Sequence, residues 1–568
     1  MAWYDEAIFY HIYPLGMTGA PKRNAYREPV HRLNTLLSWI PHIKEIGCNG
    51  IYIGPLFESV GHGYETTDYK KVDSRLGTNE DMTRFVSECH KQGIRVILDG
   101  VFNHTGRDFF VFQDLKRNRE NSHYKDWYCN VNFRGNNSAH DGFSYEGWGG
   151  HDSLPKLNQK NPVVRDYICD VIRFWVSEYD IDGIRLDAAD VLDFDYMKAM
   201  RRVANEVKTD FWLMGEVIHG DYSRCANEAT LHSVTNYALH KALYSAHNEH
   251  NYFEIAHTIK YVNETVGDCR KLYTFVDNHD VERINTKLKN KADFVPVHIL
   301  LYTLPGIPAI YYGSEFGIEG RKEKYSDDSL RPALNFEDYK DAVKTNSHTK
   351  LIAALGKIRR NTPALCYGEY CELELQTTHF AYKRTLDGQS VSITVNNGDK
   401  PVCMKLACGK AGEYVGALTG ERIRVSGGYL QVNVPAHSGE IWIPAEICGS
   451  SFAPIKDVMI TKEVKAQKAP ETEKKEEKKQ EKQEAQEIQE TQEKQKPVPE
   501  SVNVHDDAAQ KKVVVDWSKR YEDMSIEELQ EVILEKMRKN GPVTEYMLGT
   551  VRENIWHQSL VTWAKSFQ

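Results

Sequence analysis

Apolar and polar positions alternate through the N-terminal two-thirds of the chain in a way that predicts strands and helices in turn. Short apolar runs rich in branched and aromatic residues are typical of buried strands, and apolar residues at helical spacing predict the helices between them. Strands are predicted at residues 7–13, 51–53, 95–101, 183–187, 211–216, 233–237, 272–276 and 309–312, and helices at 33–46, 79–91, 163–179 and 196–207. Eight strands that alternate with helices predict a parallel sheet closed into a (β/α)8 barrel.

Beyond about residue 365 the pattern changes to short alternating runs separated by turns. This pattern predicts an antiparallel β-sandwich over residues 365–447. Residues 448–504 are dominated by Lys, Glu and Gln, a composition typical of a disordered linker or a solvated helical spacer.

The last segment, residues 505–568, regains apolar positions and predicts a helical module of unknown function. Ser525 and Glu528 fit a capping box at the start of a helix. The run Asn540-Gly-Pro542 predicts the end of that helix, and a second helix is expected at 546–567.

Composition narrows the classes of partner and the compartment. The net charge of −9 argues against nucleic acid, because a nucleic-acid-binding domain is normally basic. Eleven cysteines, with no Cys-x-x-Cys pair, favour reduced structural thiols in a reducing compartment. No secretory signal pattern stands at the N-terminus, and no apolar stretch approaches the roughly 18 residues of a membrane span. We therefore expect a cytoplasmic protein with no nucleic-acid and no membrane partner.

Acidic residues stand at or just beyond the ends of four predicted strands: Asp99, Asp187, Glu216 and Asp280. The carboxyl ends of barrel strands converge on one mouth, so these acids are expected to meet there. Arg185 precedes Asp187 by two residues on the same strand face and is expected to keep that carboxylate ionised. Glu216 follows an apolar run, which favours its protonated form. An ionised carboxylate beside a protonated carboxyl is what the cleavage of an acetal linkage requires.

These segments resemble the four signature regions of the α-amylase superfamily, glycoside hydrolase family 13. They read Asp99-Gly-Val-Phe-Asn-His104, Gly183-Ile-Arg-Leu-Asp187, Gly215-Glu216-Val217 and Phe275-Val-Asp-Asn-His-Asp280. The resemblance covers roughly residues 1–445 and extends to the segments 50–57, 62–69 and 306–315. It implies a catalytic (β/α)8 barrel over residues 1–364, a subdomain inserted after the third strand at 105–161, and the C-terminal β-sandwich.

The resemblance also implies roles for single residues. Asp187 is expected to be the nucleophile, Glu216 the general acid/base and Asp280 a third acid that grips sugar hydroxyls. The substrate-binding residues implied are Tyr64, His104, Arg185, His219, His279 and Arg331, with Asp99 as structural support. No cofactor is required, although Asn103 resembles a calcium ligand of some family members.

Each of these residues also has a structural interpretation. Asp187 and Arg185 could form an ordinary buried ion pair, and Glu216 could pair with a barrel lysine. His104 and His279 could be core residues. Trp127 and Trp148 could stack on sugars or pack the inserted subdomain. The joint occurrence of the acids in the expected order favours a catalytic site.

The segment 153–158 resembles the fifth family region of neopullulanases, cyclomaltodextrinases and maltogenic amylases. The chain begins directly at the barrel, without the N-terminal β-domain that those enzymes usually bear. Residues Ala188-Ala-Asp190-Val191 also depart from their pattern, which leaves chain-length preference and transglycosylation open.

We predict a retaining hydrolase that cleaves α-1,4 bonds of maltodextrins or cyclodextrins by double displacement through a covalent glucosyl-enzyme intermediate. The alternatives are a 4-α-glucanotransferase or an α-1,6-glucosidase on the same site, and, remotely, a non-catalytic carbohydrate-binding protein. The partner expected at the site is an α-glucan oligosaccharide. The helical module is predicted to bind a protein partner or a second copy of the chain.

Overall fold

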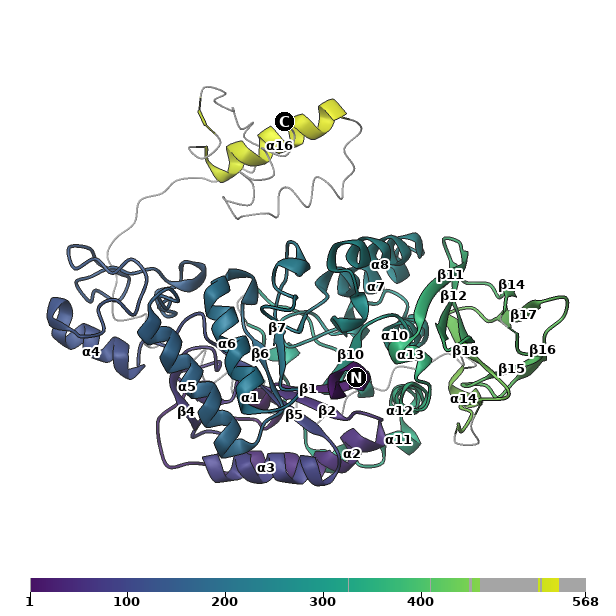
Figure 1. The fold of residues 1–568 in the computed structure, drawn as a ribbon, viewed down its shortest axis with the longest axis horizontal. Helices are drawn as coiled ribbons and strands as arrows, with labels where there is room; N and C mark the ends of the chain where they lie inside the picture. The colour runs from purple at the N-terminus through teal and green to yellow at the C-terminus, as the bar shows by residue number, and fades with distance from the viewer. Residues whose placement is uncertain are drawn as a thin grey trace, which may run out of the picture. The chain divides into compact units, whose positions relative to one another are not determined.

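The computed structural model describes residues 2–324, 326–408, 410–448, 452–459, 519–520 and 524–540. The chain forms two compact units, residues 1–464 and 465–568, and each is described by itself (Figure 1). Within the described ranges, no helix combines the length and apolar character needed to cross a membrane.

Eight parallel strands follow one another in chain order around a barrel (Figure 1). They are β1 (Phe9–Ile12), β2 (Gly50–Ile53), β5 (Arg95–Gly100), β6 (Gly183–Leu186), β7 (Trp212–Gly215), β8 (Ser233–Val234), β9 (Tyr273–Phe275) and β10 (Ile307–Tyr311). β10 pairs with β1, and a parallel bridge between Thr235 and Tyr273 joins the end of β8 to β9. The predicted (β/α)8 barrel is therefore confirmed.

Helices occupy most of the connections between the barrel strands. They include α3 (Asn79–Lys91), α5 (Pro162–Tyr179), α6 (Phe194–Val207), α7 (Tyr237–Asn248), α8 (Phe253–Val266), α10 (Phe294–Thr303) and α12 (Ser347–Arg360). The single helix predicted at 33–46 is instead a 3₁₀ helix, Arg32–Trp39, followed by α2 (Ile40–Glu45). Pro41 has no N–H to donate back to the preceding turn, which interrupts the ladder of hydrogen bonds. The connection after β7 holds only a 3₁₀ turn, Tyr222–Arg224, in place of a helix.

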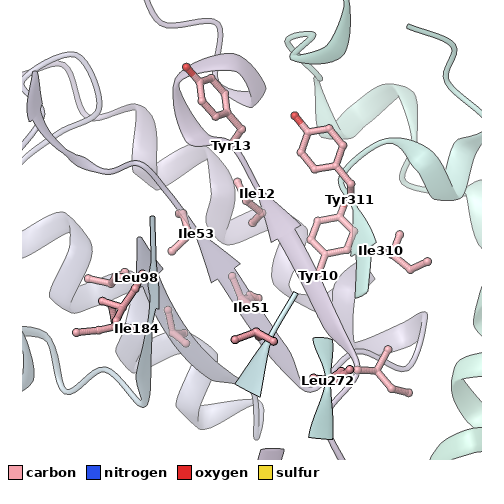
Figure 2. Close-up of a cluster of buried hydrophobic side chains, with 14 of the residues drawn as sticks. Tyr10, Ile12, Tyr13, Ile51, Ile53, Leu98, Ile184, Leu272, Ile310 and Tyr311 are labelled. Carbon is pink, nitrogen blue, oxygen red and sulfur yellow. The ribbon is translucent and has the colours of Figure 1, made fainter. Parts of the chain in front are cut away.

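Two layers of apolar side chains fix the barrel strands. Tyr10 and Ile12 of β1, with Ile51 of β2, belong to the cluster between the strands and the helices (Figure 2). Phe9 points the other way, as strand geometry requires, into a second cluster drawn from six of the barrel strands. There it stacks on Trp212 with 5.0 Å between ring centroids. Because both layers are buried, the strand ends that carry the acids are held in place.

The connection after β5 is an insertion whose aromatic side chains join the cluster between the barrel strands and the helices. Its helix α4 (Phe110–Asn118) places Phe112 edge-on against Tyr128 and Tyr145. A bridge between His104 and Lys156 ties the end of the insertion back to the end of β5. The insertion therefore returns to the carboxyl end of β5.

The C-terminal part of the first unit is an antiparallel two-sheet structure, as predicted. One sheet contains, in order, β11 (Glu369–Leu375), β12 (His379–Leu386), β13 (Gln389–Asn396), β18 (Ser438–Pro444), β15 (Glu413–Gly416) and β16 (Arg422–Arg424), and the second pairs β14 (Val402–Ala407) with β17 (Tyr429–Val434). Met404, Leu430 and Trp442 belong to one buried cluster drawn from both sheets. Buried Arg384 donates to the carbonyl of Thr303 at the end of α10 at 2.8 Å, which links this domain to the barrel.

The packed chain continues past the predicted start of the linker at residue 448. Phe452, Ile455 and Val458 are half-buried against the barrel core, and the last of them lies in the short helix α14 (Lys456–Met459). The backbone N–H of Ile455 donates to the carbonyl of Leu418 at 2.8 Å. The remainder of the predicted linker, up to residue 504, lies outside the described residues.

The second unit contains helix α16 (Ile526–Asn540). Its predicted capping box is confirmed: the N–H of Ser525 donates to the Glu528 carboxylate at 2.8 Å, and the N–H of Glu528 donates to Ser525 Oγ at 3.2 Å. Val532 and Ile533 of this helix are fully buried. The second helix predicted at 546–567 lies outside the described residues.

Candidate active site

One guanidinium group gathers three acids at the mouth of the barrel. Arg185 Nη1 donates to Asp99 Oδ1 at 2.7 Å and to Asp187 Oδ1 at 2.8 Å, and Nη2 lies 2.8 Å from Glu216 Oε2. The strands β5, β6 and β7 that supply these residues pair in that order, so their register brings the acids to one arginine. The Arg185 side chain is only 3% exposed, and solvent therefore screens these ion pairs weakly.

Asp187 has a less favourable environment for its charge than the sequence indicates. Burial raises the pKa of Asp187 well above its ordinary range; Arg185 lowers it, and the nearby carboxylates of Glu216 and Asp99 raise it further. We expected Arg185 to keep Asp187 ionised, but three carboxylates share this single positive charge. Asp187 therefore retains a proton more readily than an isolated aspartate would.

Glu216 accepts two hydrogen bonds and forms an ion pair, so its surroundings are more polar than the apolar run before it predicts. Oε2 lies in an ion pair 2.8 Å from Arg185 Nη2 and accepts the backbone N–H of Ala188 at 3.2 Å. Ala188 has φ 47°, an uncommon value for a residue other than glycine, and this turn brings its N–H to Glu216. Oε1 receives the hydroxyl of Tyr237 at 3.3 Å.

Asp280 lies between two basic groups on the other side of the mouth. Its Oδ1 accepts from Arg331 Nη2 at 2.9 Å, and its Oδ2 lies 3.0 Å from His279 Nε2. Although burial raises the pKa of Asp280, His279 and Arg331 together hold it well below the ordinary range. The side chain is 36% exposed, against 11% for Asp187, so this ionised carboxylate is the most accessible of the three predicted catalytic acids.

Tyr64 and His104 support one another beside the acids. The Tyr64 hydroxyl donates to Asp99 Oδ2 at 3.2 Å and contacts His279, with which its ring stacks. Burial lowers the pKa of His104 to about 4, so its ring is neutral at neutral pH. Its Nε2 lies 3.1 Å from the Tyr64 carbonyl and must carry the proton, because a carbonyl can only accept. This donor of His104 is therefore engaged by the protein itself.

Two predicted positions do not join the acid cluster. His219 is exposed on the loop after β7, where Asp190 is its charged neighbour. Asn103 is buried, and its Oδ1 accepts from Gln159 Nε2 at 3.0 Å. No group of three or more His, Cys, Asp or Glu side chains in the described part of the chain is arranged to hold a metal ion.

The two candidate tryptophans differ in their surroundings. Trp127 is 5% exposed and packs edge-on against Tyr124 and at a tilt against Tyr167, each with 5.4 Å between ring centroids. Trp148 begins a 3₁₀ turn, Trp148–Gly150, and is half-buried. Trp127 is therefore explained by packing within the inserted subdomain. For Trp148, packing and stacking on a sugar both stay open.

Sequence reasoning missed three polar side chains that contact the acids or support them. Tyr52 in β2 donates to Asp99 at 2.9 Å, and Tyr237 comes soon after the short strand β8. Asn278 donates to the Tyr237 hydroxyl at 3.0 Å. The only available signal for Tyr237 was its place at the end of a predicted strand, the end that faces the mouth.

Comparisons with known proteins agree with this arrangement of acids. The family described as alpha amylase, catalytic domain, matches residues 27–353. The chain is 31% identical to a cyclomaltodextrinase of Thermoanaerobacter pseudethanolicus, over 70% of this chain and 71% of that protein. It is 29% identical to neopullulanase 2 of Thermoactinomyces vulgaris, over 77% of this chain and 78% of that protein.

The chain is also similar to a third relative and to a solved structure. It is 28% identical to an intracellular maltogenic amylase of Bacillus subtilis, over 70% of this chain and 69% of that protein. A solved α-amylase from Anoxybacillus is 26% identical and superposes with a TM-score of 0.66, over 78% of this chain and 98% of that one. The similarity therefore extends over most of the solved enzyme.

Proposed function

The chain belongs to the alpha-amylase family, and on that premise we propose that it is a retaining hydrolase of α-1,4 bonds in maltodextrins or cyclodextrins. The observation that carries this proposal is the contact of Asp187 and Glu216 with the two terminal nitrogens of Arg185. Two carboxyl groups held side by side are consistent with the separation of about 5–5.5 Å found in retaining enzymes. The relatives named cyclomaltodextrinase, neopullulanase and maltogenic amylase support the substrate class.

Asp187 is the proposed nucleophile. Arg185 engages its Oδ1, and Oδ2 is then the atom that bonds to the anomeric carbon while the glycosidic bond breaks. Glu216 gives its proton to the departing oxygen. In the second step Glu216 takes a proton from water, whose oxygen displaces Asp187 and releases the sugar with its anomeric configuration retained.

The remaining residues are proposed to bind and orient the sugar. Asp280, ionised and accessible, accepts hydrogen bonds from sugar hydroxyls, and Arg331 and His279 fix its orientation. Tyr64 and His104 are proposed to line the same mouth and to contact the sugar, while the Nε2 donor of His104 stays on the Tyr64 carbonyl. Asp99 is proposed to support Arg185. His219, on the exposed loop after β7, is proposed to contact an outer part of the sugar.

A time course of the purified protein on maltoheptaose, β-cyclodextrin, pullulan and panose tests the proposal. We expect shorter sugars from the first two substrates and panose from pullulan. Products longer than the input would identify a 4-α-glucanotransferase, and glucose from panose with little other action would identify an α-1,6-glucosidase. The absence of any product would contradict the proposal and favour a carbohydrate-binding protein.

The substitution Asp187→Asn tests whether Asp187 is the nucleophile of the reaction. It should lower turnover by roughly 10⁴-fold or more, because no covalent intermediate can form. The thermal midpoint should stay the same or rise, since one of three crowded carboxylates is removed. Substantial remaining activity in a folded variant would show that the nucleophile is a different residue.

We also propose that the protein acts in the cytoplasm, which the relative named as intracellular supports. The second unit is proposed to bind a protein partner or a second copy of the chain. A capped helix, α16, with buried apolar positions such as Ile533 supports a folded module there. Pull-down and light scattering with residues 465–568 present and deleted would test this role, and identical results for both would contradict it.

A further inference from the structure

We infer that Tyr237 is a positioning residue that holds Oε1, the oxygen that carries the acid proton of Glu216, and favours the ionised form that the second step needs. This inference rests on the proposed function, because it takes Glu216 as the general acid/base. It concerns the junction of β8 and α7, a region outside the signature segments of the sequence.

Oε2 of Glu216 is not free to carry the acid proton. This atom lies 2.8 Å from the positively charged Arg185 Nη2 and accepts the N–H of Ala188 at 3.2 Å. A proton on Oε2 would lie beside a guanidinium that is always charged and would compete with a backbone donor, whereas a negative charge on this atom is favoured by both. The acid proton is therefore left to Oε1.

Asn278 sets the direction of the hydrogen bond between Tyr237 and Oε1. Asn278 Oδ1 accepts the backbone N–H groups of Asp280 and Val281 at 2.9 and 3.1 Å, which fixes the orientation of the amide. Asn278 Nδ2 then donates to the Tyr237 oxygen at 3.0 Å. Because that oxygen accepts from the amide, its own proton points to Glu216 Oε1, 3.3 Å away.

The consequence is an ordered sequence of proton positions on Oε1. In the acid form, one lone pair of Oε1 accepts the Tyr237 hydroxyl and the other holds the proton that passes to the glycosidic oxygen. After transfer, the same hydroxyl donates to a carboxylate, and such charge-assisted bonds are stronger than neutral ones. The hydroxyl therefore stabilises ionised Glu216, which takes up a proton from water in the second step.

The hydroxyl can be separated from the packing of the ring that carries it. The Tyr237 ring lies edge-on to Phe275 with 5.0 Å between centroids and an angle of 81°. Tyr237→Phe keeps this contact and removes only the hydrogen bonds to Glu216 and Asn278. The matched control is Tyr222→Phe, because the Tyr222 hydroxyl accepts the N–H of Ala238 at 3.0 Å and makes no described contact with Glu216.

The experiment is the pH dependence of kcat/KM on maltoheptaose for the wild type and both variants. In Tyr237→Phe the basic limb should move to higher pH by about one unit, because the ionised form of Glu216 loses a donor. At pH values below the limb kcat should fall more than KM changes, since the second step loses its stabilised base. Tyr222→Phe should leave the limb where it is.

An unchanged basic limb in an active Tyr237→Phe enzyme would overturn the inference. If the wild type turns over none of the four glucans, the proposed function fails instead. In that case the carbon-13 titration of the Glu216 carboxyl, assigned with Glu216→Gln, gives the answer: its midpoint should rise in Tyr237→Phe and not in Tyr222→Phe. Should Tyr237→Phe not fold, Asn278→Ala should move the limb in the same direction by less, and no movement would overturn the inference.

Discussion

Arg185 is the single residue on which the arrangement of acids depends most. Lysine in its place keeps the charge but offers one compact ammonium, which cannot meet Asp99, Asp187 and Glu216 in the geometry of the guanidinium. We expect Arg185→Lys to lower the free energy of unfolding by about 3 kcal/mol and turnover by roughly 100-fold or more. Chemical denaturation and initial rates on maltoheptaose measure the two effects.

The control for this prediction is Arg173→Lys, whose guanidinium pairs with Glu206 on the surface and is 41% exposed. It should change stability by less than about 0.5 kcal/mol and leave the rate unchanged. Equal effects of the two substitutions would show that the contacts of Arg185 with the three acids contribute no more to stability or turnover than a surface ion pair does.

Single residues were predicted well from the sequence wherever local geometry alone places them. Arg185 and Asp187 share a strand face because side chains alternate, and Glu216 comes at the end of the neighbouring strand. The contact of Tyr237 with Glu216 was out of reach, because it depends on how β7 and β8 are placed once the barrel is closed. His219 was expected to bind substrate because of the family resemblance, and the structure places it in the exposed part of the loop after β7.

Among the elements, β6 is anchored at its N-terminal end by one buried acid. The Asp182 carboxylate accepts the backbone N–H of Val96 at 2.9 Å and Arg95 Nη1 at 2.9 Å, and His90 Nε2 lies 2.7 Å from it. Lys208 Nζ lies 3.0 Å away. Burial raises the pKa of Asp182, but these partners outweigh it and lower the pKa to about 2. The folded pKa lies below the unfolded value, so this stabilisation is present above about pH 4 and is lost as pH falls toward 2.

We therefore expect Asp182→Asn to lower the free energy of unfolding by about 2 kcal/mol at pH 7. The difference from the wild type should shrink between pH 4 and pH 2, because the wild-type carboxylate is then protonated as well. Urea unfolding across pH 2–7 measures this. Asp195→Asn, on a side chain that is 82% exposed, is the control and should show no such dependence. A constant difference at every pH would contradict the linkage.

Elements with complete local signals were predicted best. Helix α3 begins at Asn79 and ends at Lys91, as the apolar spacing indicated, and Thr78 caps it together with Asp81. Strand β8 has only two residues, because pairing with β7 stops where Thr235 bridges to β9. A strand of that length has no pattern of its own, so its extent could not be predicted before the barrel was known.

For the molecule as a whole, the sequence predicted a barrel followed by a sandwich, but placed the end of the packed chain too early. The Lys, Glu and Gln content of residues 448–504 favours a linker throughout. Three apolar residues near its start, Phe452, Ile455 and Val458, nevertheless pack on the first unit. Contacts of this kind are not visible in composition, because they depend on a surface built by other elements.

Two truncations separate the packed segment from the rest of the tail. A chain that ends after Val464 keeps the whole first unit, so its turnover of maltoheptaose and its thermal midpoint should match those of the full chain. A chain that ends after Ile447 exposes the surface that Phe452, Ile455 and Val458 cover, and should lose roughly 3 kcal/mol of stability.

Calorimetry and initial rates on the two truncated proteins decide the matter. If both chains matched the full protein, the contacts of residues 452–459 would contribute nothing to the first unit. A loss of turnover already after Val464 would instead show that the second unit takes part in catalysis, and its role would then extend beyond binding a partner. The expected order, with loss only in the shorter chain, assigns catalysis to the barrel, the sandwich and the short segment packed against them.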